Sequence, residues 1–162
     1  MRNKGFSLIE LLVVLGIIGI LSSFITPKVM TYMAKGKDTK AIAVLESLRT
    51  ASQLYYLEEG KSFIQGEPYG EITVEQFDRL EKYLSNNAKD LIKDNKVEIE
   101  IGGSKESSEI KEIIYGGKIG FTTKDPETLD GDNKKSDGIN IWFHKSNDIK
   151  DFNINGEKWI DL

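Results

Sequence analysis

The sequence predicts an α+β fold in which one long N-terminal helix packs on a small C-terminal antiparallel sheet. Three patterns support this prediction. An almost uninterrupted apolar run comes first, apolar residues then recur every three or four positions, and a two-residue alternation dominates the C-terminal part. The first pattern is typical of a membrane-spanning helix, the second of an amphipathic helix, and the third of half-buried strands. The patterns divide the chain into residues 1–5, 6–26, 27–59, 60–95 and 96–162.

The apolar run extends from Phe6 to Ile25 and holds 20 residues with a single charge, Glu10. As a helix it would be about 30 Å long, which matches the hydrocarbon core of a bilayer. A charge in this core costs at least about 3 kcal/mol, so Glu10 is a candidate functional residue that needs a partner. A conventional cleaved signal peptide is the alternative, but the Ser22-Ser23-Phe24 stretch is a poor cleavage site.

Helical spacing resumes after Pro27 and continues to Tyr55, and Gly60 follows as a candidate C-cap. If Pro27 only kinks the chain, residues 7–59 form one helix. The residues that carry the amphipathic spacing are Met30, Met33 or Ala34, Ala41, Val44, Leu45, Leu48, Ala51 and Tyr55.

The connector from residue 60 to residue 95 is predicted to be partly helical. Residues 61–72 are rich in turn formers, and Thr73 with Gln76 fits a capping box at the start of a helix. The apolar spacing of Phe77, Leu80 and Leu84 gives that helix one buried face. Asn86-Asn87 is expected to divide it from a short continuation near Asp90 to Lys93.

The C-terminal part predicts strands joined by two hairpins. Gly116-Gly117 separates two strand-like runs and is a strong hairpin signal, as is Asn155-Gly156 further on. The strands predicted around these turns and elsewhere cover residues 97–101, 110–115, 118–123, 139–144, 152–154 and 158–160.

Composition excludes several classes of function. The net charge is −4, and without Arg2 and Lys4 the chain would have 20 basic against 26 acidic residues, so nucleic-acid binding through bulk charge is not expected. The absence of cysteine excludes disulfides and thiolate chemistry. The single histidine, His144, follows a strand-like run, and no known catalytic motif accompanies it, so we expect no enzyme.

The stretch "KGFSLIELLVVLGIIGIL", residues 4–21, closely resembles the N-terminus of type IV pilins and type II secretion pseudopilins. The resemblance covers about the first 30 residues, and the long helix followed by a sheet extends it to the architecture. It implies that a prepilin peptidase cuts between Gly5 and Phe6 and methylates the new amine of Phe6. Gly5 suits such a cut because a residue without a side chain lets the backbone approach a peptidase closely.

Cleavage would supply the partner that Glu10 lacks. It creates a positively charged amine at Phe6, one helical turn away, and a pair of opposite charges is cheaper to bury than either charge alone. In the filaments of this family, the amine of an incoming subunit meets the glutamate of a neighbour, which fixes their register. The resemblance further implies that the helix between Gly19 and Pro27 melts on assembly; a proline-containing segment is the weakest part of a helix.

Topology cannot be taken from charge counts alone. Arg2 and Lys4 favour a cytoplasmic leader, but the lysines that follow the apolar run outnumber them. The resemblance requires a cytoplasmic leader, a single pass through the inner membrane, a C-terminal domain outside the cytoplasm and later incorporation into an extracytoplasmic filament. The implied partners are prepilin peptidase, other copies and related pilin-like subunits, the assembly ATPase with its platform membrane protein, and the bilayer before assembly.

The predicted function is therefore that of a structural subunit of a pilus-like or secretion pseudopilus filament. A minor tip pilin that serves adhesion or DNA uptake is the alternative.

No cofactor is required, but the acidic loop at residues 125–138 is a candidate calcium site because carboxylate and amide oxygens suit calcium. Major pseudopilins bind calcium in a C-terminal loop; a solvated turn is the alternative here. The candidate ligands are Asp125, Asp130, Asp132, Asn133 and Asp137.

Overall fold

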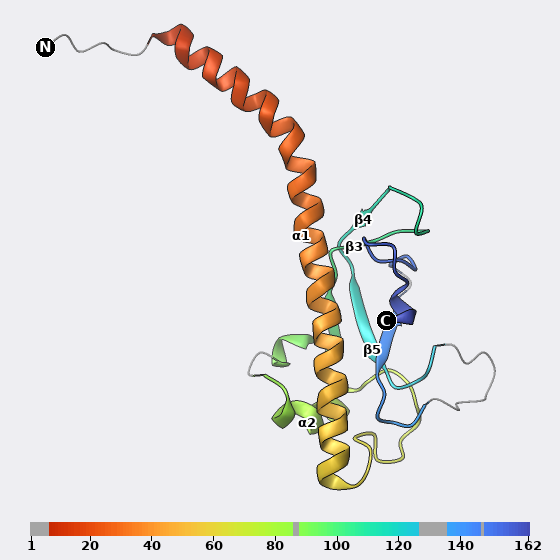
Figure 1. Ribbon diagram of the computed structural model, residues 1–162. Helices are drawn as coiled ribbons and strands as arrows, with labels where there is room; N and C mark the ends of the chain where they lie inside the picture. The colour runs from red at the N-terminus through yellow and green to blue at the C-terminus, as the bar shows by residue number, and fades with distance from the viewer. Residues whose placement is uncertain (1–6, 86–87, 127–135, 147) are drawn as a thin grey trace, which may run out of the picture. The chain divides into compact units, whose positions relative to one another are not determined.

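The computed structural model describes residues 7–85, 88–126, 136–146 and 148–162. It confirms the α+β fold: a long helix, α1 (Leu8–Glu59), precedes short helices and antiparallel strands (Figure 1). The chain divides into two compact units, Met1–Met33 and Ala34–Leu162, and each is described by itself.

Beyond α1, the second unit contains short elements. The helical ones are α2 (Val74–Leu80) and the 3₁₀ turns η1 (Glu81–Tyr83), η2 (Ala88–Leu91) and η3 (Trp159–Asp161). The main sheet is antiparallel, and its strands lie in the order β1 (Ile92–Lys93), β2 (Lys96–Glu100), β5 (Lys118–Thr122) and β6 (Trp142–Lys145). A separate pair joins β3 (Gly103–Ser104) to β4 (Ile114–Tyr115).

The single long helix predicted for residues 7–59 is confirmed, because α1 continues through Pro27. A proline has no N–H to donate to the carbonyl four residues earlier. Hydroxyls on either side of the proline also donate to helix carbonyls: Thr26 Oγ1 lies 2.8 Å from Ser22 O, and Thr31 Oγ1 lies 3.0 Å from Pro27 O. Gly60 adopts a φ of +69° and its N–H donates to Tyr56 O, as expected of the residue that ends a helix.

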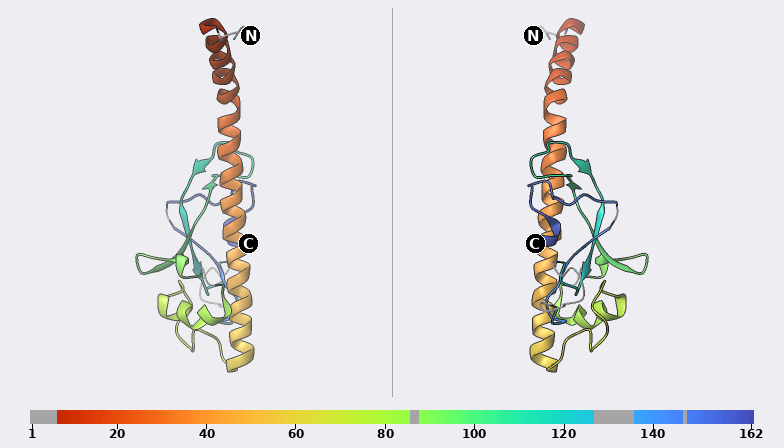
Figure 2. Two further views of the ribbon diagram at one scale, coloured as in Figure 1. Left: turned by 90° about the vertical axis from the view of Figure 1, so that its left-hand side faces the viewer. Right: turned by 90° about the vertical axis from the view of Figure 1, so that its right-hand side faces the viewer.

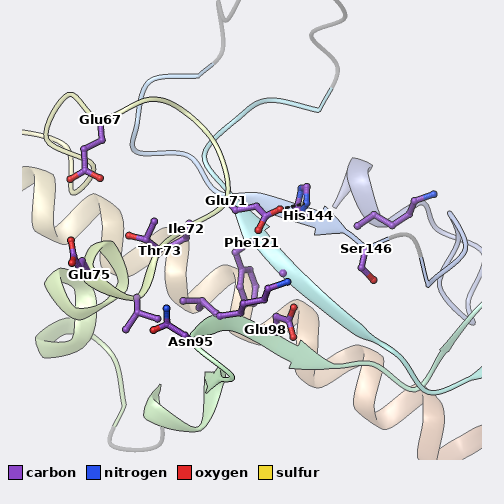
Figure 3. Close-up of a pocket in the computed structure, with 15 residues that line it drawn as sticks. Glu67, Glu71, Ile72, Thr73, Glu75, Asn95, Glu98, Phe121, His144 and Ser146 are labelled. Carbon is purple, nitrogen blue, oxygen red and sulfur yellow. Dashed lines mark ion pairs between the residues drawn. The ribbon is translucent and has the colours of Figure 1, made fainter.

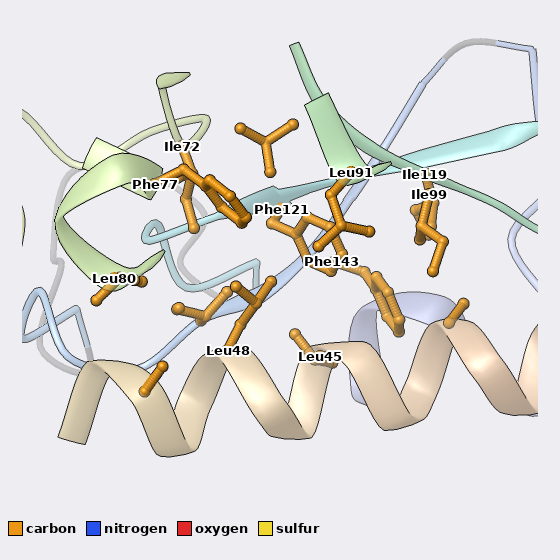
Figure 4. Close-up of a cluster of buried hydrophobic side chains, with 14 of the residues drawn as sticks. Leu45, Leu48, Ile72, Phe77, Leu80, Leu91, Ile99, Ile119, Phe121 and Phe143 are labelled. Atoms are coloured by element: carbon orange, nitrogen blue, oxygen red, sulfur yellow. The ribbon is translucent and has the colours of Figure 1, made fainter. Parts of the chain in front are cut away.

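The core of the second unit lies between one face of α1 and one face of the main sheet. Leu45 and Leu48 of α1 are fully buried opposite Ile99, Phe121 and Phe143 of the sheet (Figure 4). The turned views show these strands running along one side of this part of α1 (Figure 2). Strand residues alternate in burial, so the sheet is buried on its inner face and its outer face carries polar side chains.

The hairpin predicted at Gly116-Gly117 is wrong. The pairings Ile99↔Ile119 and Gly103↔Tyr115 keep one register, so the chain segments around β2–β3 and β4–β5 form one interrupted antiparallel ladder. The glycine pair lies inside this ladder with φ values of +82° and +116°. Glycine is needed there because a Cβ on Gly117 would lie 2.6 Å from Ile149 Cγ2. A dipeptide typical of turns thus serves as a break within a strand.

The two strands predicted on either side of Asn155-Gly156 are not formed. The turn exists, with Gly156 at a φ of +93°, but the chain around it forms only the single bridge Phe152↔Lys158. Strand pairing stops because Trp159 enters the core as part of η3. Its side chain is fully buried and packs edge-on against Phe143 at 5.4 Å between ring centroids. Burial of this large side chain outweighs extension of the ladder.

In the connector, the predicted capping box is confirmed at the start of α2. Thr73 Oγ1 accepts the N–H of Gln76, whose side chain accepts the N–H of Thr73. α2 ends at Leu80 and η1 follows, so the predicted helix is shorter than its apolar spacing indicates. The turn predicted near Asp90 is found as η2, but Ile92 and Lys93 form β1 and so belong to the sheet. The strand predicted at residues 139–144 is found as β6, with shifted bounds.

Asp38 joins α1 to two distant parts of the chain and was not predicted to be buried. Its side chain is fully buried. The Gly102 N–H donates to Oδ1 at 2.7 Å, and the Ile154 N–H donates to Oδ2 at 3.2 Å. Gly102 must lack a side chain here, because a Cβ would lie 1.9 Å from Ala34 O. Burial raises the pKa of Asp38, although the hydrogen bonds from these backbone groups lower it in part.

Candidate functional site

The first unit presents an apolar surface that nothing in the described chain covers. From residue 7 to residue 33, every described side chain is exposed or, at Thr31, half-buried. Leu8 is 78% exposed and Phe24 is 69% exposed, which is unusual for large apolar side chains of a soluble protein. By length and composition α1 could cross a membrane, and none of its most apolar window is buried. This surface therefore needs lipid or other helices around it.

Glu10 is the one charged residue between residues 7 and 27. Its carboxylate folds back toward the start of α1, where Oε2 accepts the N–H of Ser7 at 2.8 Å. Ser7 Oγ in turn accepts the N–H of Ile9 at 3.4 Å. The glutamate supplies one half of a capping box, while the serine hydroxyl caps the second N–H of the helix instead of the third; both contacts satisfy donors that the first turn of a helix leaves free. The signal, a serine three residues before a glutamate, is present in the sequence but did not enter the prediction.

Gly5 and Phe6, the predicted cleavage residues, lie outside the described residues. The Glu10 carboxylate accepts the N–H of Ser7, the first described residue, at the N-terminal end of α1. Assembly through a contact between the Glu10 carboxylate and the Phe6 amine stays a prediction.

Gly19 and Pro27, the residues predicted to bound a melting segment, both lie within continuous helix. Nothing lies within 4 Å of a Cβ built on Gly19, so its absence of a side chain is not required by packing within the chain. Glycine in a helix interior costs about 1 kcal/mol relative to alanine, and proline weakens the helix further. The segment is thus helical but intrinsically weak, and melting on assembly stays a prediction.

The predicted calcium loop is described only in part, since Asp130, Asp132 and Asn133 lie outside the described residues. Asp125 is buried, and its N–H donates to Ser136 Oγ at 2.9 Å. Asp137 accepts the N–H groups of Ile139 and Asn140 at 2.8 Å each. Within the described ranges, no three acidic or histidine side chains converge as metal ligands. Calcium binding by this loop stays a prediction.

His144 lies on the outer face of the sheet, at a groove of about 720 Å³ (Figure 3). Its Nε2 is 2.8 Å from Glu71 Oε1, and these side chains are 43% and 63% exposed. Solvent screens such a contact, so it contributes at most about 1 kcal/mol. Glu98, Gly120 and His144 occupy one cross-strand row, and the glycine leaves the sheet surface open between the two side chains. His144 therefore makes a surface contact, and this geometry shows no catalytic partner for it among the described residues.

Comparisons with known proteins place the strongest similarity at the N-terminus. Residues 1–26 match the family described as the prokaryotic N-terminal methylation motif. The chain is 41% identical over 62 residues to a fimbrial protein of Pseudomonas aeruginosa. It is 41% identical over 59 residues to the type IV major pilin protein PilE1 of Neisseria gonorrhoeae, and 38% identical over 60 residues to the type IV major pilin protein PilA of Myxococcus xanthus.

These matches cover 38%, 36% and 37% of this chain. They span 40%, 36% and 27% of the relatives, respectively, so the chain matches well under half the length of each. No solved structure matches the chain. The family match therefore covers the methylation motif, and the matches to these three relatives cover little more than a third of the chain.

Proposed function

We propose that this chain, a type IV pilin family member by its N-terminal methylation motif and N-terminal helix, is a structural subunit of a pilus filament. One observation carries the proposal: the first turn of an exposed apolar helix holds a lone carboxylate, which accepts the N–H of Ser7 at the N-terminal end of the helix. An apolar helix of this kind is stable in a bilayer or among copies of itself.

Processing by prepilin peptidase is the first step of the proposed function. The peptidase cuts between Gly5 and Phe6 and methylates the Phe6 amine, as the match of residues 1–26 to the methylation motif supports. Before assembly, the subunit is held in the inner membrane by α1, with its second unit outside the cytoplasm. The assembly ATPase and its platform protein then move it into the filament.

In the proposed function, the Glu10 carboxylate has two alternative partners. In the single subunit it caps the helix by accepting the Ser7 N–H, and it lies close enough in the chain to pair with the Phe6 amine of the same subunit. In the filament it pairs with the Phe6 amine of a neighbour. Because a buried charge without a partner is costly, subunits stop at the register in which every carboxylate meets an amine.

Melting between Gly19 and Pro27 would let the filament extend. The hydroxyls of Ser23, Thr26 and Thr31 already donate to main-chain carbonyls around Pro27, at 2.7 to 3.0 Å. Such bonds compete with the regular helical pattern and can satisfy carbonyls that an unwound turn exposes.

The names of the curated relatives support a surface pilus over a secretion pseudopilus or a tip-located adhesin.

The experiment that tests this function expresses the full chain in a pilus-assembling bacterium whose own major pilin gene is deleted. Shearing the cells should release filaments that an antibody against the second unit decorates along their length in electron microscopy. Decoration at the tips alone would indicate a minor pilin. Full retention of the protein in the membrane, with the peptidase present and the platform protein active, would contradict the proposal.

A further inference from the structure

The segment that follows the membrane-spanning run has a one-sided charge. Between Glu10 and Asp38 the chain carries only positive side chains, at Lys28, Lys35 and Lys37. Asp38 does not neutralise them, because its two oxygens accept the backbone N–H groups of Gly102 and Ile154 and it is fully buried. An unbalanced cluster of this kind next to an apolar helix is a candidate surface for anions.

Two of the lysines share a face of α1 with an exposed tyrosine. Lys28, Tyr32 and Lys35 follow one another at intervals of four and three residues, so they lie along one helical stripe. Both lysines are exposed, and Tyr32 is 73% exposed. Lys37 lies on another face and contacts Glu100 at 3.5 Å. Within the described part of the chain, no ion pair holds Lys28 or Lys35.

The position along the helix matches the headgroup layer of a bilayer. Lys28 is three residues past Ile25, the end of the apolar run, and Lys35 is ten residues past it. At 1.5 Å per residue these positions extend from about 5 Å to about 15 Å beyond the hydrocarbon edge. Tyrosine is enriched at this depth because it has an apolar ring and a polar hydroxyl, and lysine ammonium groups reach phosphate there.

We infer that Lys28, Tyr32 and Lys35 form a binding surface for the phosphate groups of anionic phospholipids. The surface acts on the membrane-held subunit and so rests on the proposed function. Each ammonium makes a charge-assisted hydrogen bond to a lipid phosphate, and the tyrosine ring lies between the headgroups. A lysine near an anionic membrane surface contributes roughly fivefold in affinity, so two lysines favour anionic over zwitterionic lipid by more than about tenfold.

The test uses the full chain in nanodiscs made of equal parts phosphatidylglycerol and phosphatidylcholine. After gentle detergent extraction, native mass spectrometry measures which lipids stay bound. The double variant Lys28→Gln, Lys35→Gln should lose the preference for phosphatidylglycerol at least tenfold. The matched control is Lys61→Gln, Lys111→Gln, which removes the same charge from exposed positions outside this stripe and should keep the preference.

Equal lipid preference in the two double variants would overturn the inference. Displacement of the bound lipid by millimolar inorganic phosphate would also overturn it, because that result indicates a site for free phosphate. These results are separable from failure of the proposed function. A chain that does not insert into nanodiscs fails as a pilin precursor, whereas an inserted chain without lipid preference fails only here. Tyr32→Leu should reduce retention of both lipids without changing their ratio, because it removes the hydroxyl and leaves the charges.

Discussion

Replacing Asp38 with alanine is expected to lower the free energy of unfolding of the second unit by roughly 2–5 kcal/mol. The backbone N–H groups of Gly102 and Ile154 lose their acceptors and remain buried. Gly102 cannot move closer to the helix to compensate, since it already approaches the backbone of Ala34. Denaturant unfolding of the full chain in detergent, followed by the fluorescence of buried Trp159, measures the loss.

Thr39→Ala is the matched control for this measurement. Thr39 follows Asp38 on α1, but it is exposed, and its hydroxyl donates to Lys35 O within its own helix. Its replacement should change the free energy of unfolding by no more than about 0.5 kcal/mol. An equal and small effect of the two substitutions would show that Asp38 does not join α1 to the sheet.

The raised pKa of Asp38 also predicts a pH dependence. A carboxyl whose pKa is higher in the folded than in the unfolded state favours folding most when it is protonated. Its contribution is present below the unfolded pKa and is lost as the pH rises through the folded pKa. Relative to Asp38→Asn, which does not titrate, the wild-type chain should therefore gain stability when the pH falls from 7 toward 4. A difference that stays constant over this range would contradict the raised pKa.

Replacing Glu10 with alanine is expected to reduce sheared surface filaments at least tenfold while leaving cleavage after Gly5 intact. In a filament core, each Phe6 amine would then lack a carboxylate, and an unpaired buried charge costs several kcal/mol, about 3–5 when one partner of a pair is removed. Glu10→Gln keeps a hydrogen-bond acceptor for the Ser7 N–H but removes the charge, so it separates helix capping from ion pairing.

If pairing with the amine matters, Glu10→Gln should fail in assembly as completely as Glu10→Ala. If capping alone matters, Glu10→Gln should assemble almost as well as the wild-type chain. Glu59→Gln changes the same charge at the exposed C-terminal end of α1 and serves as the control. Wild-type filament yield from Glu10→Ala would exclude the proposed role of this residue.

The parts of the fold that follow local rules could be predicted from the sequence. The length of α1, the Thr73 capping box and the glycine after the helix depend on neighbouring residues, and the structure confirms all three. The two glycine-containing dipeptides were misjudged because their roles depend on contacts with distant residues. The need for a glycine at position 117 comes from the close approach of Ile149. Strand pairing near Gly156 ends because Trp159 is buried in the core.

Asp38 is another residue whose role depends on distant parts of the chain. It falls on the buried stripe of α1 between Ala34 and Ala41, where a charged residue breaks the apolar spacing. That break was a usable signal, but the reason for it lies in N–H groups 64 and 116 residues further along the chain. The Glu10 cap, in contrast, is entirely local and could have been predicted from Ser7.

The most direct test of the proposed function is the mass of the N-terminal peptide from the native, membrane-extracted protein. The peptide is expected to begin at Phe6 and to carry one added methyl group on its amine. This result would establish cleavage after Gly5 and provide the amine with which Glu10 is proposed to pair. A peptide that begins at Met1 in cells with an active prepilin peptidase, or one that begins beyond Ser22, would contradict the proposed function.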